Sequence, residues 1–235
     1  MPAKKLPDTD EERIKALEII LEREEEAEEG KTVLSLKEIY NLKSSLSAYK
    51  RSHANVQQAL DNEADAKKKY IFLFQNAQLY ISHFIQVLYL AIIRNEVKAE
   101  NLSYYGLKYS NNFTVPNLLT EEAVVEWGER LINGEMARIS HGGAAIYNPA
   151  ITKVKVHYDL FKEIAHSLKI HRQNIQRLQE GMTELQDEAD NLIWTAWTKV
   201  EFAYGALPAE KRDQKYNDYG ILFHHQTGKQ LDVFD

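Results

Sequence analysis

Three histidines stand in apolar helix seams of this sequence, where imidazole nitrogens could bind a metal ion or a polar ligand. His157 and His171 lie two heptads apart, about 21 Å along a straight helix, so they cannot share one ion. His53 could meet one of them across a helical bundle, with Gln78 as a neighbour. The alternative is that each histidine is a hydrogen-bonded core residue that fixes the register of the helices.

One pair of residues resembles half of a di-iron helical motif. Glu163 and His166 have the Glu-x-x-His spacing, but such bundles need a second pair and further glutamates. The residue three positions before His53 is Lys50, and Tyr80 stands three positions before His83. The sequence therefore predicts a solvated pair here, and neither a metal centre nor a cofactor.

Aromatic side chains crowd the middle of the chain and form a second candidate site. With nearby asparagines they could line a groove for a ligand or a peptide, since amphipathic aromatics are favoured at interfaces. The alternative is that they cover the open end of a helical bundle. The aromatics concerned are Tyr104, Tyr105, Tyr109 and Trp127.

Signatures of catalysis are incomplete in this sequence. His141-Gly142-Gly143 lacks an accompanying G-x-S-x-G elbow, and Thr227-Gly228-Lys229 lacks the upstream glycine of a P-loop. The chain has 0 cysteines, which excludes disulfides, thiolate metal ligands and cysteine nucleophiles. We therefore predict that the protein is not an enzyme, although fold alone never excludes catalysis.

The charge distribution argues against nucleic acid as a partner. The net charge is −6, and residues 8–29 hold 11 acidic and 3 basic side chains. Lys4 and Lys5 add two positive charges, so residues 30–235 are neutral overall. The first residues contain no apolar signal segment, and we expect a cytoplasmic protein.

The stretch from Tyr70 to Ile93 contains no charged residue and is the expected centre of the fold. Its length suits a membrane span, but glutamines, a serine, an asparagine and a histidine would be costly in hydrocarbon. Apolar residues lie on more than one of its faces, so we predict a core helix that neighbouring helices cover on more than one side. The predicted seam comprises Ile71, Phe74, Ile81, Ile85, Leu88 and Ile92.

The elements that would position these residues are all helical. Residues 1–30 are predicted to form an acidic helical arm: residues 1–7 are disordered, and Thr9 and Glu12 cap a helix at about 10–29 whose second half is a solvated face. Further helix starts are predicted at a capping box of Ser35 and Glu38 and at Thr120. Residues 31–235 are predicted to form the bundle domain: a hairpin at about 35–97, an irregular insertion at 98–149, a second hairpin at about 150–205 and a tail at 206–235. The fold class is thus an all-α antiparallel bundle.

Each hairpin needs a turn. We place the first near Asp61–Asp65, after a seam from Ile39 to Leu60 with unbroken three- and four-residue spacing. The second turn is expected at Gly181, followed by a new helix that Thr183 and Gln186 would cap.

A repeated motif indicates an internal duplication. Tyr105-Gly106-Leu107 and Tyr219-Gly220-Ile221 are 114 positions apart (219 − 105), and each follows a helical region. If the chain is duplicated, Gly106 and Gly220 should occupy equivalent turns.

Together these features predict a non-enzymatic interaction or assembly module that associates with itself or with another protein. We expect neither nucleic acid nor a membrane as a partner. The alternative is a bundle that binds a small ligand or a metal through the seam histidines and the aromatic insertion.

Overall fold

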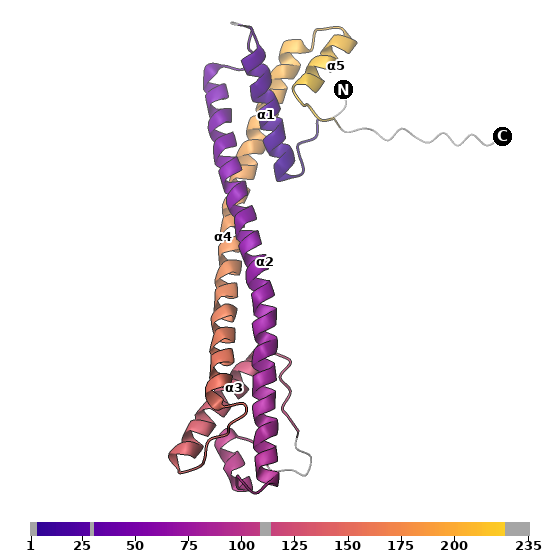
Figure 1. The fold of residues 1–235 in the computed structure, drawn as a ribbon. Coiled ribbons are helices and arrows are strands. Elements are labelled where there is room, and N and C mark those ends of the chain that lie inside the picture. The colour runs from indigo at the N-terminus through magenta and orange to yellow at the C-terminus, as the bar shows by residue number, and fades with distance from the viewer. Residues whose placement is uncertain (1–3, 29–30, 109–113, 224–235) are drawn as a thin grey trace, which may run out of the picture. The chain divides into compact units, whose positions relative to one another are not determined.

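The computed structural model describes residues 4–28, 31–108 and 114–223. Five α-helices and a 3₁₀ helix follow one another along the chain (Figure 1). Their bounds are α1 Asp10–Glu26, α2 Leu36–Ile93, η1 Ala99–Tyr105, α3 Glu121–Ser140, α4 Ile151–Tyr204 and α5 Ala209–Asp218. The predicted all-α fold class is confirmed, and the described residues contain isolated β-bridges but no strand.

The chain forms two compact units, each with its own hydrophobic core. Unit 1 consists of Met1–Ala59 and Ile175–Asp235, and unit 2 of Leu60–Asn174. Both α2 and α4 therefore contribute one part to each unit.

The two predicted turns are wrong, because α2 and α4 are continuous helices of 58 and 54 residues. Residues 61–65 contain neither glycine nor proline, and the buried spacing continues through them from Ala59 to Ala66. Gly181 lies inside α4, where one glycine costs only about 1 kcal/mol relative to alanine. The antiparallel pairs are therefore formed between α2 and α4, and not within each predicted hairpin.

The core of unit 1 is built by α1, α5 and the adjoining parts of α2 and α4. Leu17 and Ile20 of α1 are fully buried, so the acidic helix packs on its own chain. Capping boxes start α1 and α2 as predicted, at Thr9–Glu12 and Ser35–Glu38. Residues 4–7 were expected to be disordered, but Lys4 forms a β-bridge with Phe223.

The core of unit 2 contains one side of the uncharged stretch of α2. Ile81, Phe84, Ile85 and Leu88 are fully buried there, against residues of η1, α3 and α4. Ile71 departs from the predicted seam, since it is 49% exposed. The mid-chain segment is also more regular than expected, because it holds η1 and the 20 residues of α3.

The same series of elements occurs twice along the chain. A short helix that starts at a threonine cap, Thr9 or Thr120, is followed by a long helix, a short helix and the Tyr-Gly motif. Gly106 and Gly220 have φ of 70° and 67°, and both donate to the carbonyl three residues earlier. The next residue of each motif donates to the carbonyl five residues earlier, which completes a Schellman-type turn. The predicted equivalence of the two glycine turns is confirmed.

Aligning these two series gives residue pairs with matching burial. Short helices align at an offset of 111 positions (120 − 9) and long helices at 112 (193 − 81). We call residues paired in this way equivalent. Fully buried equivalents include Ala77 with Ala189, Ile81 with Ile193, Leu88 with Val200 and Tyr49 with Phe161.

Candidate interaction surface and buried polar sites

A buried ionic cluster lies in unit 2, between η1 and α3. Arg138 donates from Nε and Nη2 to the carboxylate of Glu135 at 2.9 and 2.8 Å, and Tyr105 also donates its hydroxyl to that carboxylate. The backbone N–H of Ile146 donates to Glu135 at 2.9 Å, and Arg138 reaches the carbonyl of Ala144. Glu135 and Arg138 are both buried, so the cluster ties η1, α3 and the following loop together.

Unit 1 has the equivalent carboxylate at Glu24, while the neighbouring Arg23 binds Glu26 and the carbonyl of Asp218 instead. Tyr219 donates its hydroxyl to Glu24 at 2.8 Å, and the backbone N–H groups of Val33 and Leu34 donate at 3.3 and 3.0 Å. The position equivalent to Arg138 is Ala27. Glu24 is buried, which corrects the prediction that the whole second half of the acidic helix is solvated.

The two buried tyrosines have shifted pKa values. Burial and the hydrogen bond to Glu135 raise the pKa of Tyr105, while burial and the hydrogen bond to Glu24 raise that of Tyr219. Both hydroxyl groups therefore stay protonated and donate at neutral pH. These sites join helix ends to loops.

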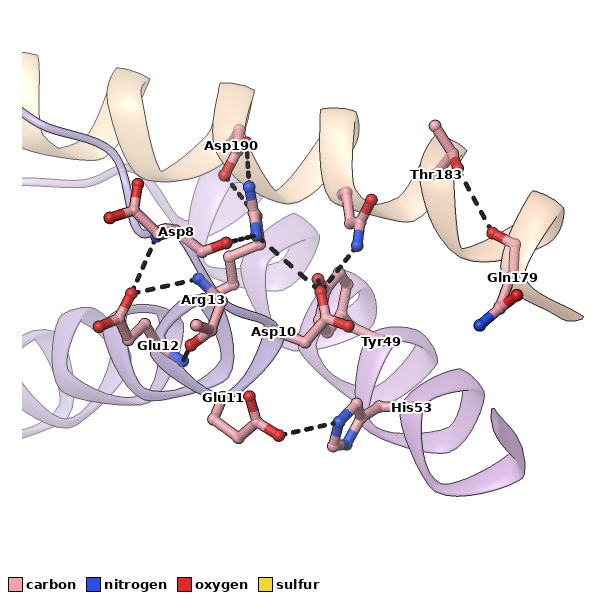
Figure 2. A network of polar contacts seen from close by, with 12 residues as sticks. Asp8, Asp10, Glu11, Glu12, Arg13, Tyr49, His53, Gln179, Thr183 and Asp190 are labelled. Atoms are coloured by element: carbon pink, nitrogen blue, oxygen red, sulfur yellow. Dashed lines mark hydrogen bonds and ion pairs between the residues drawn. The ribbon is translucent and has the colours of Figure 1, made fainter. Parts of the chain in front are cut away.

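A second polar network in unit 1 joins α1 to the two long helices (Figure 2). Arg13 binds Asp190 with two parallel hydrogen bonds of 2.9 and 3.0 Å. Asp10 accepts from the hydroxyl of Tyr49 at 2.7 Å and from Gln186 at 2.8 Å. Burial and the hydrogen bond to Asp10 raise the pKa of Tyr49. The network fixes α1 against α2 and α4.

His53, the first of the predicted seam histidines, lies at the edge of this network. Its Nε2 is 3.4 Å from the carboxylate of Glu11, as Figure 2 shows. The histidine is half-buried, whereas Glu11 is exposed. This pair is typical of a surface contact and does not form a ligand site.

The other two seam histidines belong to unit 2. His157 stacks on Tyr80 with ring centroids 3.9 Å apart, and burial together with Lys153 lowers its pKa. Its Nδ1 is buried without a hydrogen-bond partner among the described residues. His171 is half-buried 14 positions further along α4 (171 − 157), about 21 Å away on a helix.

Gln78, expected beside a histidine, donates from Nε2 to the carbonyl of Leu118 at 2.5 Å. Among the described residues no three His, Asp or Glu side chains gather closely enough to hold a metal ion.

The predicted aromatic site is divided. Tyr105 is in the core, Tyr104 lies 5.5 Å from the ring of His141, and Trp127 is half-buried with the guanidinium of Arg130 at 5.0 Å. Tyr104, Tyr105 and Arg130 line a shallow pocket of about 490 Å³ between η1 and α3. Tyr109 falls outside the described residues.

The most distinctive surface of unit 2 is an exposed, uncharged face of α2. Phe72 is 63% exposed, Leu79 59% and Leu90 49%. They recur with polar residues at three- and four-residue spacing, so they form one stripe on the helix. We call the following exposed residues the α2 stripe: Phe72, Gln75, Leu79, His83, Gln86, Leu90 and Ile93.

The equivalent face of α4 in unit 1 has a different composition. Its exposed residues are Glu184, Asp187, Asn191, Thr195, Thr198 and Phe202, and the seventh position is Gly205. Residues 70–93 contain no charged side chain, whereas the equivalent residues 182–205 contain Glu184, Asp187, Glu188, Asp190, Lys199 and Glu201. The fold therefore permits an ordinary polar, solvated face at this place on the long helix, as α4 shows. The α2 stripe differs from such a face in having apolar residues and no charge.

Tyr70–Ile93 is covered on more than one side, by residues of η1, α3 and α4, but the α2 stripe leaves a further side of the helix exposed. In the described part of the chain, α2 contains a window apolar enough to cross a membrane by length and composition, with mean hydropathy 1.3 and 44% of its residues buried. The core helix of a soluble protein passes the same test. The absence of charge was visible in the sequence, but the exposed side of the helix was not.

Comparison of this chain with protein-family models, with curated proteins and with solved structures found no match. The functional argument therefore rests on the chain's own residues and on the comparison between its two units.

Proposed function

We propose that this chain is a non-enzymatic protein-interaction module whose binding face is the α2 stripe. The observation that carries the proposal is the contrast between equivalent faces. Both are exposed to water, but the face on α4 carries glutamate and aspartate where α2 carries Phe72 and Gln75. Exposed apolar side chains that gather on one face of a protein mark an interaction site, whereas single scattered ones do not.

The remaining properties of the chain fit a binding role. The ionisable groups of the two buried tyrosine–glutamate sites are engaged with one another and with backbone N–H groups. The neutral charge of residues 30–235 disfavours nucleic acid, and we propose a protein partner in the cytoplasm.

Site-specific photo-cross-linking in cells that naturally make the protein tests this proposal. A photoreactive amino acid replaces Leu79 of the stripe in one variant and the equivalent Asn191 of α4 in a matched control. We expect a protein adduct at position 79 and none, or far less, at position 191. Because both positions are exposed, a difference between them reports binding and not access to solvent.

Absence of an adduct at position 79, or equal labelling at the two positions, would contradict the proposed function.

A further inference from the structure

We infer that the partner of the α2 stripe is a second copy of this chain, bound antiparallel about a two-fold axis near Ser82 and His83. This inference rests on the proposed function and names the occupant of the same face. A two-fold contact is isologous, so the stripe must be complementary to itself.

The spacing of the stripe meets that requirement. Six of its seven positions are symmetric about the point between residues 82 and 83, so an antiparallel copy brings Phe72 opposite Ile93 and Leu79 opposite Gln86, while His83 lies beside the axis. A stripe that contained one sign of charge would repel its copy, whereas this stripe has no charge. Gln75 and Gln86 face leucines in this register, and each lies one helical turn from the partner's other glutamine, where the two side chains can hydrogen-bond.

The charges beyond the two ends of the stripe suit an antiparallel arrangement. Lys67, Lys68 and Lys69 precede the stripe, whereas the segment after it carries Arg94, Glu96, Lys98 and Glu100 and is neutral overall, with Arg94 bound to Glu96. An antiparallel copy places the lysines near the C-terminal end of the partner's helix, where cations are favoured. A parallel copy would instead bring the three lysines of each chain together.

A pocket lies at the end of the stripe where the partner's Phe72 would arrive. Leu90, Tyr147, Val87 and Ile146 line the apolar part of this pocket of about 320 Å³, and Arg94, Glu96 and Asn148 line its polar part. Tyr147 is 86% exposed, an unusual position for an aromatic side chain with no partner to cover it. An aromatic side chain that enters such a pocket is a typical anchor of a protein interface.

The size of the surface sets the expected strength of the dimer. The stripe extends over 22 residues (93 − 72 + 1), about 32 Å of helix. Its seven side chains and the pocket are fewer than the 20–30 residues that each partner of a standard interface contributes. We therefore expect a reversible dimer that dissociates on dilution, and not an obligate one.

A lipid surface is the other apolar occupant, and the stripe fits it less well. Gln75, His83 and Gln86 alternate with the apolar residues, so insertion would bury their polar groups without partners. A copy of the same stripe can hydrogen-bond these groups.

Sedimentation of the purified full chain over a range of concentrations tests the inference. We expect a monomer–dimer equilibrium for the natural chain. Leu79→Glu should raise the dimer Kd about 100-fold or more, since a charge without a partner would be buried at the interface. Asn191→Glu, at the equivalent exposed position of α4, should change it by no more than about twofold. Unchanged thermal unfolding of both variants shows that each still folds.

Disulfide trapping tests the direction of the two helices, because the chain has 0 cysteines of its own. A mixture of Phe72→Cys and Ile93→Cys chains should form a mixed disulfide, and Phe72→Cys alone should not. Preferential cross-linking of Phe72→Cys with itself would indicate parallel helices and overturn the inference.

Two further results would also overturn it. One is a natural chain that stays monomeric at concentrations up to about 1 mM, which would mean a dimer Kd well above the millimolar range. The other is a monomer that binds phosphatidylcholine vesicles through the stripe and loses that binding with Leu79→Glu. An adduct at position 79 with a different protein would exclude the second copy and leave the proposed interaction function intact.

Discussion

The two units place different chemistry at equivalent positions of one helical scaffold. In unit 1 the contact between α1 and the long helices is polar, through Arg13 with Asp190 and Tyr49 with Asp10. In unit 2 three aromatic rings of the long helices pack together, with centroids 5.4–6.0 Å apart, and the contact with α3 is the hydrogen bond from Tyr70 to Glu121, the equivalent of Asp10. The replacements are Phe161 for Tyr49, Phe74 for Gln186 and Tyr70 for Met182.

This difference teaches which features the scaffold requires. The threonine caps, the buried glutamate–tyrosine pair and the glycine turn occur in both units. They satisfy backbone groups at helix ends, and an unsatisfied buried group costs free energy in either unit. The residues of the long helices at this place can be mainly polar or mainly aromatic, because either choice fills the same space with its polar groups paired.

The largest expected effect comes from the two buried glutamates. Glu135→Gln should lower the free energy of unfolding by about 3–5 kcal/mol, because Arg138 stays buried without a carboxylate. Glu24→Gln should cost about 1–3 kcal/mol, since only neutral donors face it. Denaturant unfolding can follow unit 2 through Trp127 and unit 1 through Trp197. Equal losses for the two variants would show that the arginine does not distinguish the units.

Gly134 and Gly181 are glycines in one unit only, because the equivalent residues of the other unit are Arg23 and Lys69. Gly134→Ala should destabilise unit 2 by about 1–3 kcal/mol, because the added Cβ would lie 2.6 Å from the carbonyl oxygen of Tyr104. Gly181→Ala should stabilise the protein by about 0.5–1 kcal/mol, since nothing lies within 4 Å and the site is inside a helix. Thermal melts of the two variants should shift in opposite directions, and a shift of Gly181→Ala to lower temperature would contradict this reading.

Tyr49→Phe makes unit 1 more like unit 2 at one position. The substitution removes the hydroxyl donor to Asp10 but keeps the ring in the core. We expect a loss of about 1 kcal/mol, because Gln186 still donates to Asp10. Phe161→Tyr is the matched change in unit 2. If Tyr49→Phe lowers the free energy of unfolding more than Glu24→Gln does, the network depends on this hydroxyl more than its geometry indicates.

The smallest effect concerns the start of α2, where Lys199 and Ser35 lower the pKa of Glu38 to about 2. A depressed folded-state pKa gives stability that is present above the unfolded value and is lost as pH falls through the folded value. The contribution of Glu38 should therefore disappear between about pH 4.5 and pH 2. In the Glu38→Gln variant, the melting temperature should therefore depend less on pH over this range. If the variant and the natural chain have the same dependence of melting temperature on pH, the lowered pKa of Glu38 is wrong. Unit 2 has no counterpart of this effect, because the equivalent residue at the start of α4 is Ala150.

Local signals predicted those features that neighbouring residues decide. The caps at Thr9, Ser35 and Thr120 were readable because a side chain and a backbone N–H three residues away are enough to form them. The two Tyr-Gly turns were readable for the same reason, since only glycine adopts their positive φ without strain.

The candidate sites were less predictable than the helices. Sequence reasoning allowed His53 to meet one of the other two histidines across the bundle, beside Gln78, but the contacts of His53 and Gln78 come from elements distant in the chain, at Glu11 and Leu118. Glu24 and Glu135 resembled the surrounding surface glutamates, because nothing local marks a carboxylate that loop N–H groups will bind.

By itself, the sequence determined that the chain is helical, where most helices start, and that two related series of elements follow each other. These features depend on contacts within a few residues. Only the tertiary structure decided that α2 and α4 run on without a turn, and which side of residues 70–93 faces water. A helix with apolar residues on several faces can be buried on any of them, and the choice depends on the neighbours that the rest of the chain supplies.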